Sequence, residues 1–134
     1  MNPLKVIRVR DVMSDSYVMV DGITTVKEGI RLARQGVVKA LIVNKRYDDD
    51  EYGIVLMNDI AKKVLAQNRS CERTNIYEIM TKPALSVPPD MNVKYCARLF
   101  ERFGVSRAPV IDDGNVIGIV SYNNIVLNGM ALDA

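Results

Sequence analysis

The sequence repeats a series of short blocks in the same order, and this repeat limits the possible folds more than any single residue does. The matched blocks are Asp11-Val12-Met13 with Glu78-Ile79-Met80, Val26-Lys27 with Val93-Lys94, Gly36-Val37-Val38-Lys39-Ala40 with Gly104-Val105-Ser106-Arg107-Ala108, and Gly53-Ile54-Val55 with Gly118-Ile119-Val120. Such self-similarity indicates two copies of one structural unit. We expect the halves to be residues 1–69, with an N-terminal arm, and residues 70–134, with a linker. They should pack about a pseudo-two-fold axis, with two quasi-equivalent ligand clefts between them.

The length and charge of the chain restrict its partners. The 134 residues equal one ordinary domain, and two halves of this size would be marginal alone, so we expect one shared core. The formal net charge of +2 gives no strong basic field of the kind that binds nucleic acid. Neither a helix-turn-helix spacing nor a basic helix is evident. We therefore expect no nucleic-acid partner.

Histidine is absent from the sequence, which removes the commonest general base and the commonest transition-metal ligand. The sequence also has no P-loop and no paired carboxylates at a useful spacing. We expect neither an enzyme nor a metal site, and no required cofactor.

The chain has no apolar run near the roughly 20 residues that span a bilayer, and its start lacks the apolar core of a signal peptide. We expect a cytoplasmic protein with no membrane partner. Cys71 and Cys96 are too few and too far apart for a disulfide framework. Cys96 falls on the apolar face of a predicted helix and is expected to be a buried thiol.

Each half predicts an extended start, a helix, two strands and a final helix. Thr25 and Glu28 have the spacing of a capping box, and apolar residues at helical spacing then run to Gly36. Residues 93–104 repeat this pattern. The final helices are expected to begin at Asn58 and Asn123, which are suitable N-cap residues.

The strands are predicted at residues 40–43, 53–56, 108–111 and 116–121. Asp112-Asp-Gly-Asn115 predicts a tight hairpin turn between the last two. The first pair is joined by a longer loop with the acidic run Asp48-Asp49-Asp50-Glu51. Its spacing is not that of a calcium loop, so we interpret this run as a solvated hairpin tip. Residues 1–10 are expected to form a leader strand or arm.

The most informative polar residues lie where each second strand meets the final helix. The two segments are Gly53-Ile-Val-Leu56-Met-Asn-Asp59 and Gly118-Ile-Val-Ser121-Tyr-Asn-Asn124. A glycine permits close approach of a ligand or backbone, and the N–H groups at a helix start favour anions. A hydroxyl can bind phosphate or sugar, and a carboxylate can accept both hydroxyls of a ribose.

The ordered blocks resemble the CBS motif, and the pair resembles a Bateman module. The resemblance runs from about Val9 to Gly129 and rests on the Met-ending starts, the Gly-Val-x-Lys/Arg-Ala blocks and the Gly-Ile-Val-x-x-Asn endings. It implies an α/β (α+β) fold of two β-α-β-β-α motifs joined through their sheets, commonly as symmetric dimers. It also implies binding of adenine nucleotides or related ligands between the motifs, and regulation of another protein.

The family's signature ends with Ser or Thr followed three residues later by Asp, and each half departs from it once. The first half keeps Asp59 but has Leu56 in place of the hydroxyl, and the second keeps Ser121 but has Asn124 in place of the carboxylate. A lost hydrogen bond costs about 0.5–1.5 kcal/mol, so binding would be weakened about two- to tenfold rather than excluded. Helix capping is an alternative role for Asp59 and Ser121.

The resemblance implies further ligand contacts. Arg107 matches a position for a phosphate-contacting cation, with Lys39 as its counterpart, and Pro109 follows Arg107 as it does in the family. Ser14 and Thr81 match the residue that lines the adenine pocket. Solvated surface charge is the alternative for Arg107 and Lys39, and turn formation is the alternative for Ser14 and Thr81. Met13 and Met80 are expected to be core residues.

Two functions remain open. One is a regulatory module that binds AMP, ADP, ATP or a related adenosyl compound and signals to an unidentified partner protein. The other is a ligand-free dimeric adaptor with degenerate nucleotide sites. The predicted helices have more apolar residues than one face needs, which predicts a C2 homodimer; these residues are Leu32, Ala33, Leu99, Phe100 and Phe103.

Overall fold

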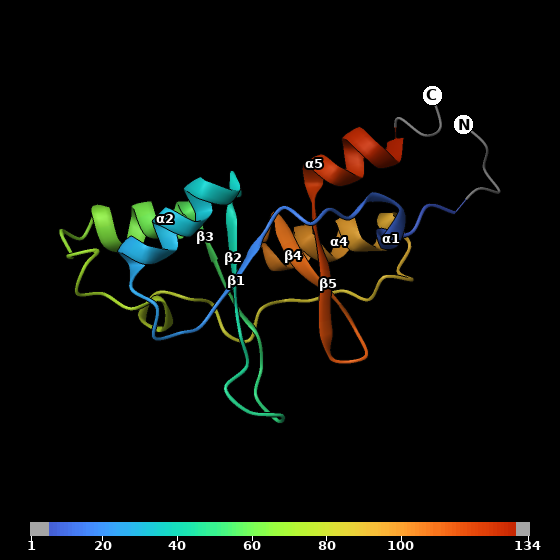
Figure 1. Ribbon diagram of the computed structural model, residues 1–134. Helices are drawn as coiled ribbons and strands as arrows, with labels where there is room; N and C mark the ends of the chain where they lie inside the picture. Colours follow the sequence, from blue (N-terminus) through green and yellow to red (C-terminus); the bar gives the residue numbers. More distant parts are fainter. Residues whose placement is uncertain (1–5, 131–134) are drawn as a thin grey trace. The chain divides into compact units, whose positions relative to one another are not determined.

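The computed structural model describes residues 6–130, which form two compact units (Figure 1). Unit 2 is the continuous segment Ser16–Ala84. Unit 1 combines the residues up to Asp15 with those from Leu85 onward. The units therefore do not follow the predicted division at residue 69. Residues 1–5 of the predicted leader lie outside the described residues.

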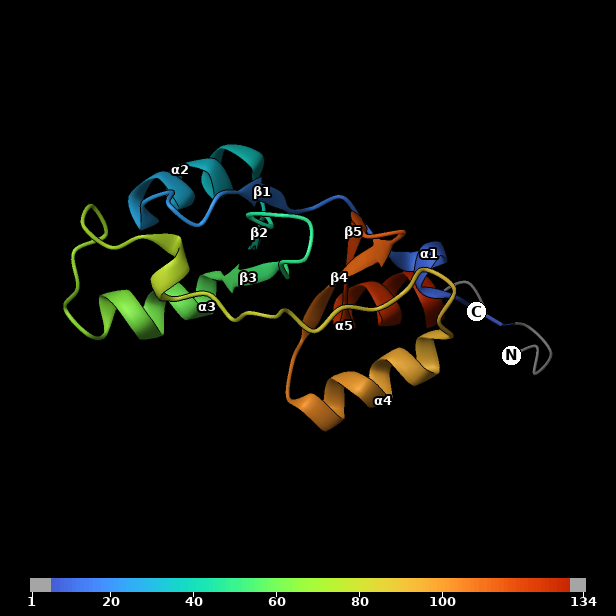
Figure 2. The same ribbon diagram turned by 90° about the horizontal axis from the view of Figure 1, so that it is seen from below.

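Unit 2 is a three-stranded sheet that packs its helices on one face (Figure 2). Its elements are β1 (Val18–Val20), α2 (Val26–Gly36), β2 (Ala40–Val43), β3 (Gly53–Leu56), α3 (Met57–Ile60), the π-helical turn η1 (Ala61–Leu65) and the 3-10 turn η2 (Ile76–Glu78). β1 lies parallel to β2, and β3 pairs antiparallel with β2. Leu41, Val43 and Val55 share the core with α2 and η1 because alternate strand residues face the same side.

Unit 1 has the same plan around a two-stranded antiparallel sheet. Its elements are α1 (Val9–Val12), α4 (Val93–Phe103), β4 (Arg107–Asp112), β5 (Asn115–Ser121), α5 (Tyr122–Asn124) and the π-helical turn η3 (Ile125–Gly129). Val87 bridges in parallel to Val110, where β1 pairs with β2 in unit 2. Asp113 and Gly114 both have positive φ, of 51° and 76°, which confirms the predicted tight hairpin.

The start of each repeat packs into the unit built from the other repeat. Val9 and Val12 are buried in the unit 1 core, and backbone hydrogen bonds join Val9 N–H to the Met91 carbonyl (2.8 Å) and Val93 N–H to the Ile7 carbonyl (2.9 Å). In unit 2, Ile76 and Ile79 fill the corresponding core positions. This exchange explains why the compact units differ from the sequence repeats. Of the predicted leader strand or arm, Val9 and Arg10 belong to the helical turn α1, and Arg8 forms an isolated antiparallel bridge with Asn92.

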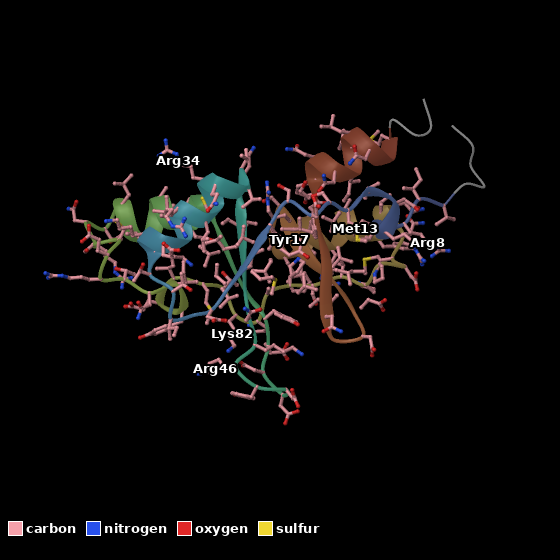
Figure 3. All side chains as sticks on the ribbon, in the orientation of Figure 1. Arg8, Met13, Tyr17, Arg34, Arg46 and Lys82 are labelled. Atoms are coloured by element: carbon pink, nitrogen blue, oxygen red, sulfur yellow. The ribbon has the colours of Figure 1, made fainter. Side chains whose placement is uncertain are left out.

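In each exchanged segment, the sulfur atom of a methionine packs against a strand glycine. A Cβ added at Gly118 would lie 2.9 Å from the Met13 sulfur, and one added at Gly53 would lie 2.8 Å from the Met80 sulfur. Met13 and Met80 also pack against the cores of their units, as the sequence predicted. Figure 3 shows Met13 beside β5. The glycines are needed here because any side chain would occupy the space of the sulfur.

Strand pairing corrects the alignment of the two repeats by one residue. Ala40 pairs with Leu56, and Arg107 pairs with Ser121. The residues just before β2 and β4 correspond in the same way. Met57 N–H donates to the Lys39 carbonyl, and Tyr122 N–H donates to the Ser106 carbonyl. The structural counterpart of Arg107 is therefore Ala40, and that of Lys39 is Ser106. The predicted equivalence of Lys39 and Arg107 was wrong.

The same correction applies to the helix ends. The helix α2 ends at Gly36, as the sequence predicted, but its left-handed C-cap is Val37 with φ 53°. Gly104, with φ 68°, occupies this position in unit 1. A β-branched residue is unusual in this conformation because its Cβ crowds the backbone.

The other helix predictions had mixed outcomes. The Thr25 hydroxyl caps α2 by accepting from Glu28 N–H at 3.1 Å, while the Glu28 carboxylate accepts from Arg31. The final helices begin one residue before the predicted N-caps, so that Leu56 and Ser121 occupy the N-cap positions. Cys96 is buried, as expected, and burial raises the pKa of its thiol to about 11. Within residues 6–130 no helix has the length and apolar character needed to cross a membrane.

Replacing Val37 by Gly should stabilise the protein. The left-handed conformation costs a non-glycine residue about 1–2 kcal/mol, of which about 0.5–1 kcal/mol would remain after the entropic cost of glycine. Val37 is 85% exposed, so little packing is lost. Urea unfolding should show an increased free energy of unfolding. The matched variant Gly104→Ala should lose about 1 kcal/mol, and an unchanged free energy of unfolding in either variant would contradict the backbone strain assigned to this position.

Gly118→Ala should destabilise the protein by about 1–3 kcal/mol through overpacking. The new Cβ would meet the Met13 sulfur and lie 3.2 Å from the Ser14 carbonyl oxygen. A double-mutant cycle with Met13→Ala should give a coupling of at least about 0.5 kcal/mol, because removing the sulfur relieves the clash. Met80→Ala is the matched control: since Met80 packs on Gly53, its effect should add to that of Gly118→Ala. Additive effects for Met13→Ala would refute the proposed contact.

Candidate functional site

In unit 1 the predicted residues meet where β5 runs into α5, which we call the unit 1 junction (Arg107, Ser121 and Asn124). Arg107 and Ser121 are directly opposed in the antiparallel pair, so their side chains leave the sheet on the same face. Ala108, Val110 and Val120 form the core on the other face. Arg107 and Ser121 therefore lie on the side of the sheet turned away from this core.

Ser121 and Asn124 hydrogen bond to each other. The Asn124 Oδ1 atom accepts from the Ser121 N–H and hydroxyl, each at 3.0 Å, and Asn124 N–H donates to Ser121 Oγ at 3.1 Å. These bonds fix the oxygen of the Asn124 amide toward Ser121 and leave its Nδ2 group facing away. Arg107 is half-buried and has no ion pair or hydrogen bond with any residue that the structure describes. This junction thus offers two sets of donors, the Arg107 guanidinium and the Asn124 amide.

The corresponding unit 2 junction consists of Ala40, Leu56 and Asp59. Ala40 and Leu56 are the opposed pair, so a methyl group and an isobutyl group stand where unit 1 has a guanidinium and a hydroxyl. Asp59 Oδ2 accepts the Leu56 N–H at 2.8 Å. Its Oδ1 has no hydrogen-bond donor among the described residues and can accept from a ligand. The junction therefore combines the buried Ala40 methyl group, the half-buried Leu56 side chain and one carboxylate.

The exchanged segments bring two more predicted residues to these strands. Ser14 exchanges two backbone hydrogen bonds of 2.9 Å with Ile119, two residues before Ser121 in β5. Thr81 does the same with Ile54, at 3.0 Å, two residues before Leu56 in β3. Pro109 is buried in β4, and Lys39 is exposed just before β2.

The eight predicted residues are thus divided between the units. Unit 1 holds Ser14, Arg107, Pro109, Ser121 and Asn124, and unit 2 holds Lys39, Asp59 and Thr81. Sequence reasoning missed Ala40 as the counterpart of Arg107. The sequence did contain this correspondence. The same number of residues separates Met13 from Met80, Val26 from Val93, and Ala40 from Arg107.

The acidic hairpin between β2 and β3 is only partly the solvated tip that the sequence predicted. Asp48, Asp49 and Glu51 are exposed, but Asp50 is buried. Asp50 accepts from Lys82 Nζ (2.6 Å) and from the Arg46 backbone N–H (2.9 Å) and Nε (3.3 Å). Figure 3 shows Arg46 and Lys82 at this hairpin. Within residues 6–130 no three His, Cys, Asp or Glu side chains gather to hold a metal ion.

The bonds to Lys82 and Arg46 hold the pKa of Asp50 well below that of an ordinary carboxyl. A lowered pKa means that the folded state favours the charged carboxylate, so this stabilisation is present above about pH 4 and is lost as the pH falls below it. Asp50→Asn should therefore lower the urea midpoint at pH 7. The difference from wild type should narrow below about pH 4.

Asp49→Asn is the matched control for this experiment. Asp49 is exposed at the same hairpin, so the urea midpoint of this variant should equal that of wild type both at pH 7 and below about pH 4. A difference between Asp50→Asn and wild type that stays constant down to pH 2 would contradict the assigned role.

Unit 2 also has an open hollow of about 550 Å³ beside η1. Two of its cations have protein partners, since Lys63 Nζ donates to the Ile79 carbonyl at 2.9 Å and Arg69 pairs with Glu78 at 2.8 Å. Lys63 of η1 and Arg69, which follows η1, thus both bind the exchanged segment around η2, so these cations have a structural role.

Comparison with known proteins identifies relatives of both repeats. The family model described as CBS domain matches residues 9–66 and again residues 76–129. The protein MK0525 of Methanopyrus kandleri is 31% identical over 104 residues, which are 77% of this chain. The chain spans 52% of the length of that relative.

Two solved structures extend the comparison. The hexameric CBS-CP12 protein from bloom-forming cyanobacteria is 34% identical, with a TM-score of 0.91 over 96% of this chain and 74% of that chain. The CBS domain pair of protein MJ0100, solved with 5′-methylthioadenosine and S-adenosyl-L-methionine, is 25% identical, with a TM-score of 0.81 over 96% of this chain and 99% of that chain.

Proposed function

Because this chain belongs to the CBS-domain family and carries two copies of the domain, we propose that it is a regulatory module that binds an adenosine-containing nucleotide. The candidate ligands are AMP, ADP and ATP, and occupancy would be signalled to a partner protein through a shift between two conformations. The two matched segments, residues 9–66 and 76–129, are both CBS domains, and we propose binding and no reaction for them.

The observation that carries this proposal is the unit 1 junction. It presents a guanidinium with no partner among the described residues and the outward Nδ2 donors of Asn124, beside the buried Ser121 hydroxyl, on the face of the sheet turned away from the core. Arginine is well suited to phosphate because its planar donors match two phosphate oxygens at once. The similar MJ0100 pair, which was solved with two adenosyl compounds, supports an adenosyl ligand.

The ligand-free adaptor remains a second candidate, because one observation favours it. Ser121 and Asn124 already satisfy each other, and the Asp59 carboxylate already caps the Leu56 N–H. Capping alone thus explains why these residues are present. In this proposal the protein would dock through exposed apolar helix positions, which are Leu65, Phe103, Val126, Leu127 and Met130.

The homodimer remains part of both proposals, but its predicted surface changes. Ala33 and Phe100 are buried in their own units, and Leu32 and Leu99 pack against the cores. Phe103 alone of the five predicted residues is strongly exposed, at 59%. A purely monomeric species in light scattering would overturn the proposed homodimer.

Calorimetric titration of nucleotide-stripped protein with AMP and then ATP tests the nucleotide proposal. We expect saturable binding that Ser121→Gly weakens about two- to tenfold, because one hydrogen-bonding hydroxyl is lost while glycine still tolerates the N-cap position. Ser106→Gly, an exposed serine in the same unit, should bind like wild type. Folded protein that gives no heat with any adenosyl compound at millimolar concentration would refute the proposal and favour the adaptor.

A further inference from the structure

We propose that the two junctions select adenosine compounds that differ in the charge of their 5′ substituent. The unit 1 junction takes a ligand with a 5′ phosphate, whereas the unit 2 junction takes an adenosine compound whose 5′ substituent is uncharged or cationic. This inference rests on the proposed function and specifies the ligand class of each site.

The unit 1 junction has the charge and donors for an anion. Arg107 has no acidic partner among the described residues, so its charge is not neutralised by them. At the position of the family's carboxylate, Asn124 contributes no negative charge and directs its Nδ2 donors away from Ser121. The replacement of Asp by Asn and the presence of Arg107 therefore act in the same direction, because both favour a phosphate.

The unit 2 junction has the reverse character. Ala40 stands at the position of Arg107, and Leu56 stands at the position of Ser121, so no side-chain donor faces the ligand from this strand pair. Asp59 retains its negative charge and an open Oδ1 atom. A ribose hydroxyl can donate to this carboxylate, but a phosphate would meet a like charge with no cation opposite it.

Lys39 is the nearest cation along the chain to the unit 2 pair and does not replace Arg107. It lies one residue before β2, so it is not part of the strand pairing that sets Ala40 opposite Leu56. Its side chain is exposed, and its carbonyl accepts from Met57 N–H. With the alignment corrected by one residue, Ala40 and not Lys39 stands at the position of Arg107, so only the unit 1 strand pair carries a cation at this position.

Calorimetry with AMP and 5′-methylthioadenosine tests the inference on the full chain. We expect both compounds to bind at once, so that saturation with one leaves the affinity for the other within about twofold. Arg107→Ala should weaken AMP about tenfold or more and leave 5′-methylthioadenosine unchanged, because a charge-assisted bond is lost only in unit 1. Arg102→Ala removes the same charge from an exposed position on α4 and should change neither affinity.

The variant Asp59→Asn tests unit 2 separately. It keeps an oxygen to cap Leu56 N–H, as Asn124 does for Ser121, so the fold should persist. We expect 5′-methylthioadenosine to bind about two- to tenfold more weakly and AMP affinity at unit 1 to be unchanged. Asp49→Asn, at the exposed hairpin, should leave both affinities as in wild type.

The possible failures are distinguishable. If AMP displaces 5′-methylthioadenosine competitively, or if one variant weakens both compounds equally, the charge selection is wrong while the nucleotide proposal stands. If neither compound binds at millimolar concentration to folded wild-type protein, both proposals fail.

Discussion

The contact of a methionine sulfur with a strand glycine is the interaction on which the arrangement of this protein depends. Met13 lies on Gly118 and Met80 lies on Gly53, so the start of each repeat is anchored to the strand of the other. Each anchor also aligns two backbone hydrogen bonds, which join Ser14 to Ile119 and Thr81 to Ile54. A larger residue at either glycine would separate these segments, because the sulfur occupies the volume of its Cβ.

This exchange also determines the composition of the two junctions. Ser14 is far from Ser121 in sequence but bridges to Ile119 in the same strand, β5, and Thr81 bridges in the same way to Ile54 in β3, the strand of Leu56. Each unit therefore combines residues from both repeats. The two junctions share a backbone geometry, including the capping of the backbone N–H of Leu56 in unit 2 and of Ser121 in unit 1. They differ in side-chain charge, which the backbone does not constrain.

The sequence predicted the regular elements well where the local signal was strong. Strands 40–43 and 53–56 have the predicted limits, and the Asp-Gly turn forms the expected hairpin because both central residues tolerate positive φ. It located the helix end at Gly36 but did not identify Val37 as the left-handed C-cap, because a β-branched residue rarely adopts a positive φ. It also failed at Asp50, whose burial depends on Lys82, a residue from beyond the hairpin.

By itself, the sequence determined the two-fold repetition, the order of helices and strands, and the polar residues that end each strand pair. These follow from short-range periodicity, turn chemistry and capping, which act over a few residues. The tertiary structure decided which segments form each unit and which residues face each other across the strands. Those outcomes depend on hydrogen-bond register and on close packing between distant segments, and a shift of one residue exchanges Lys39 for Ala40 opposite Leu56.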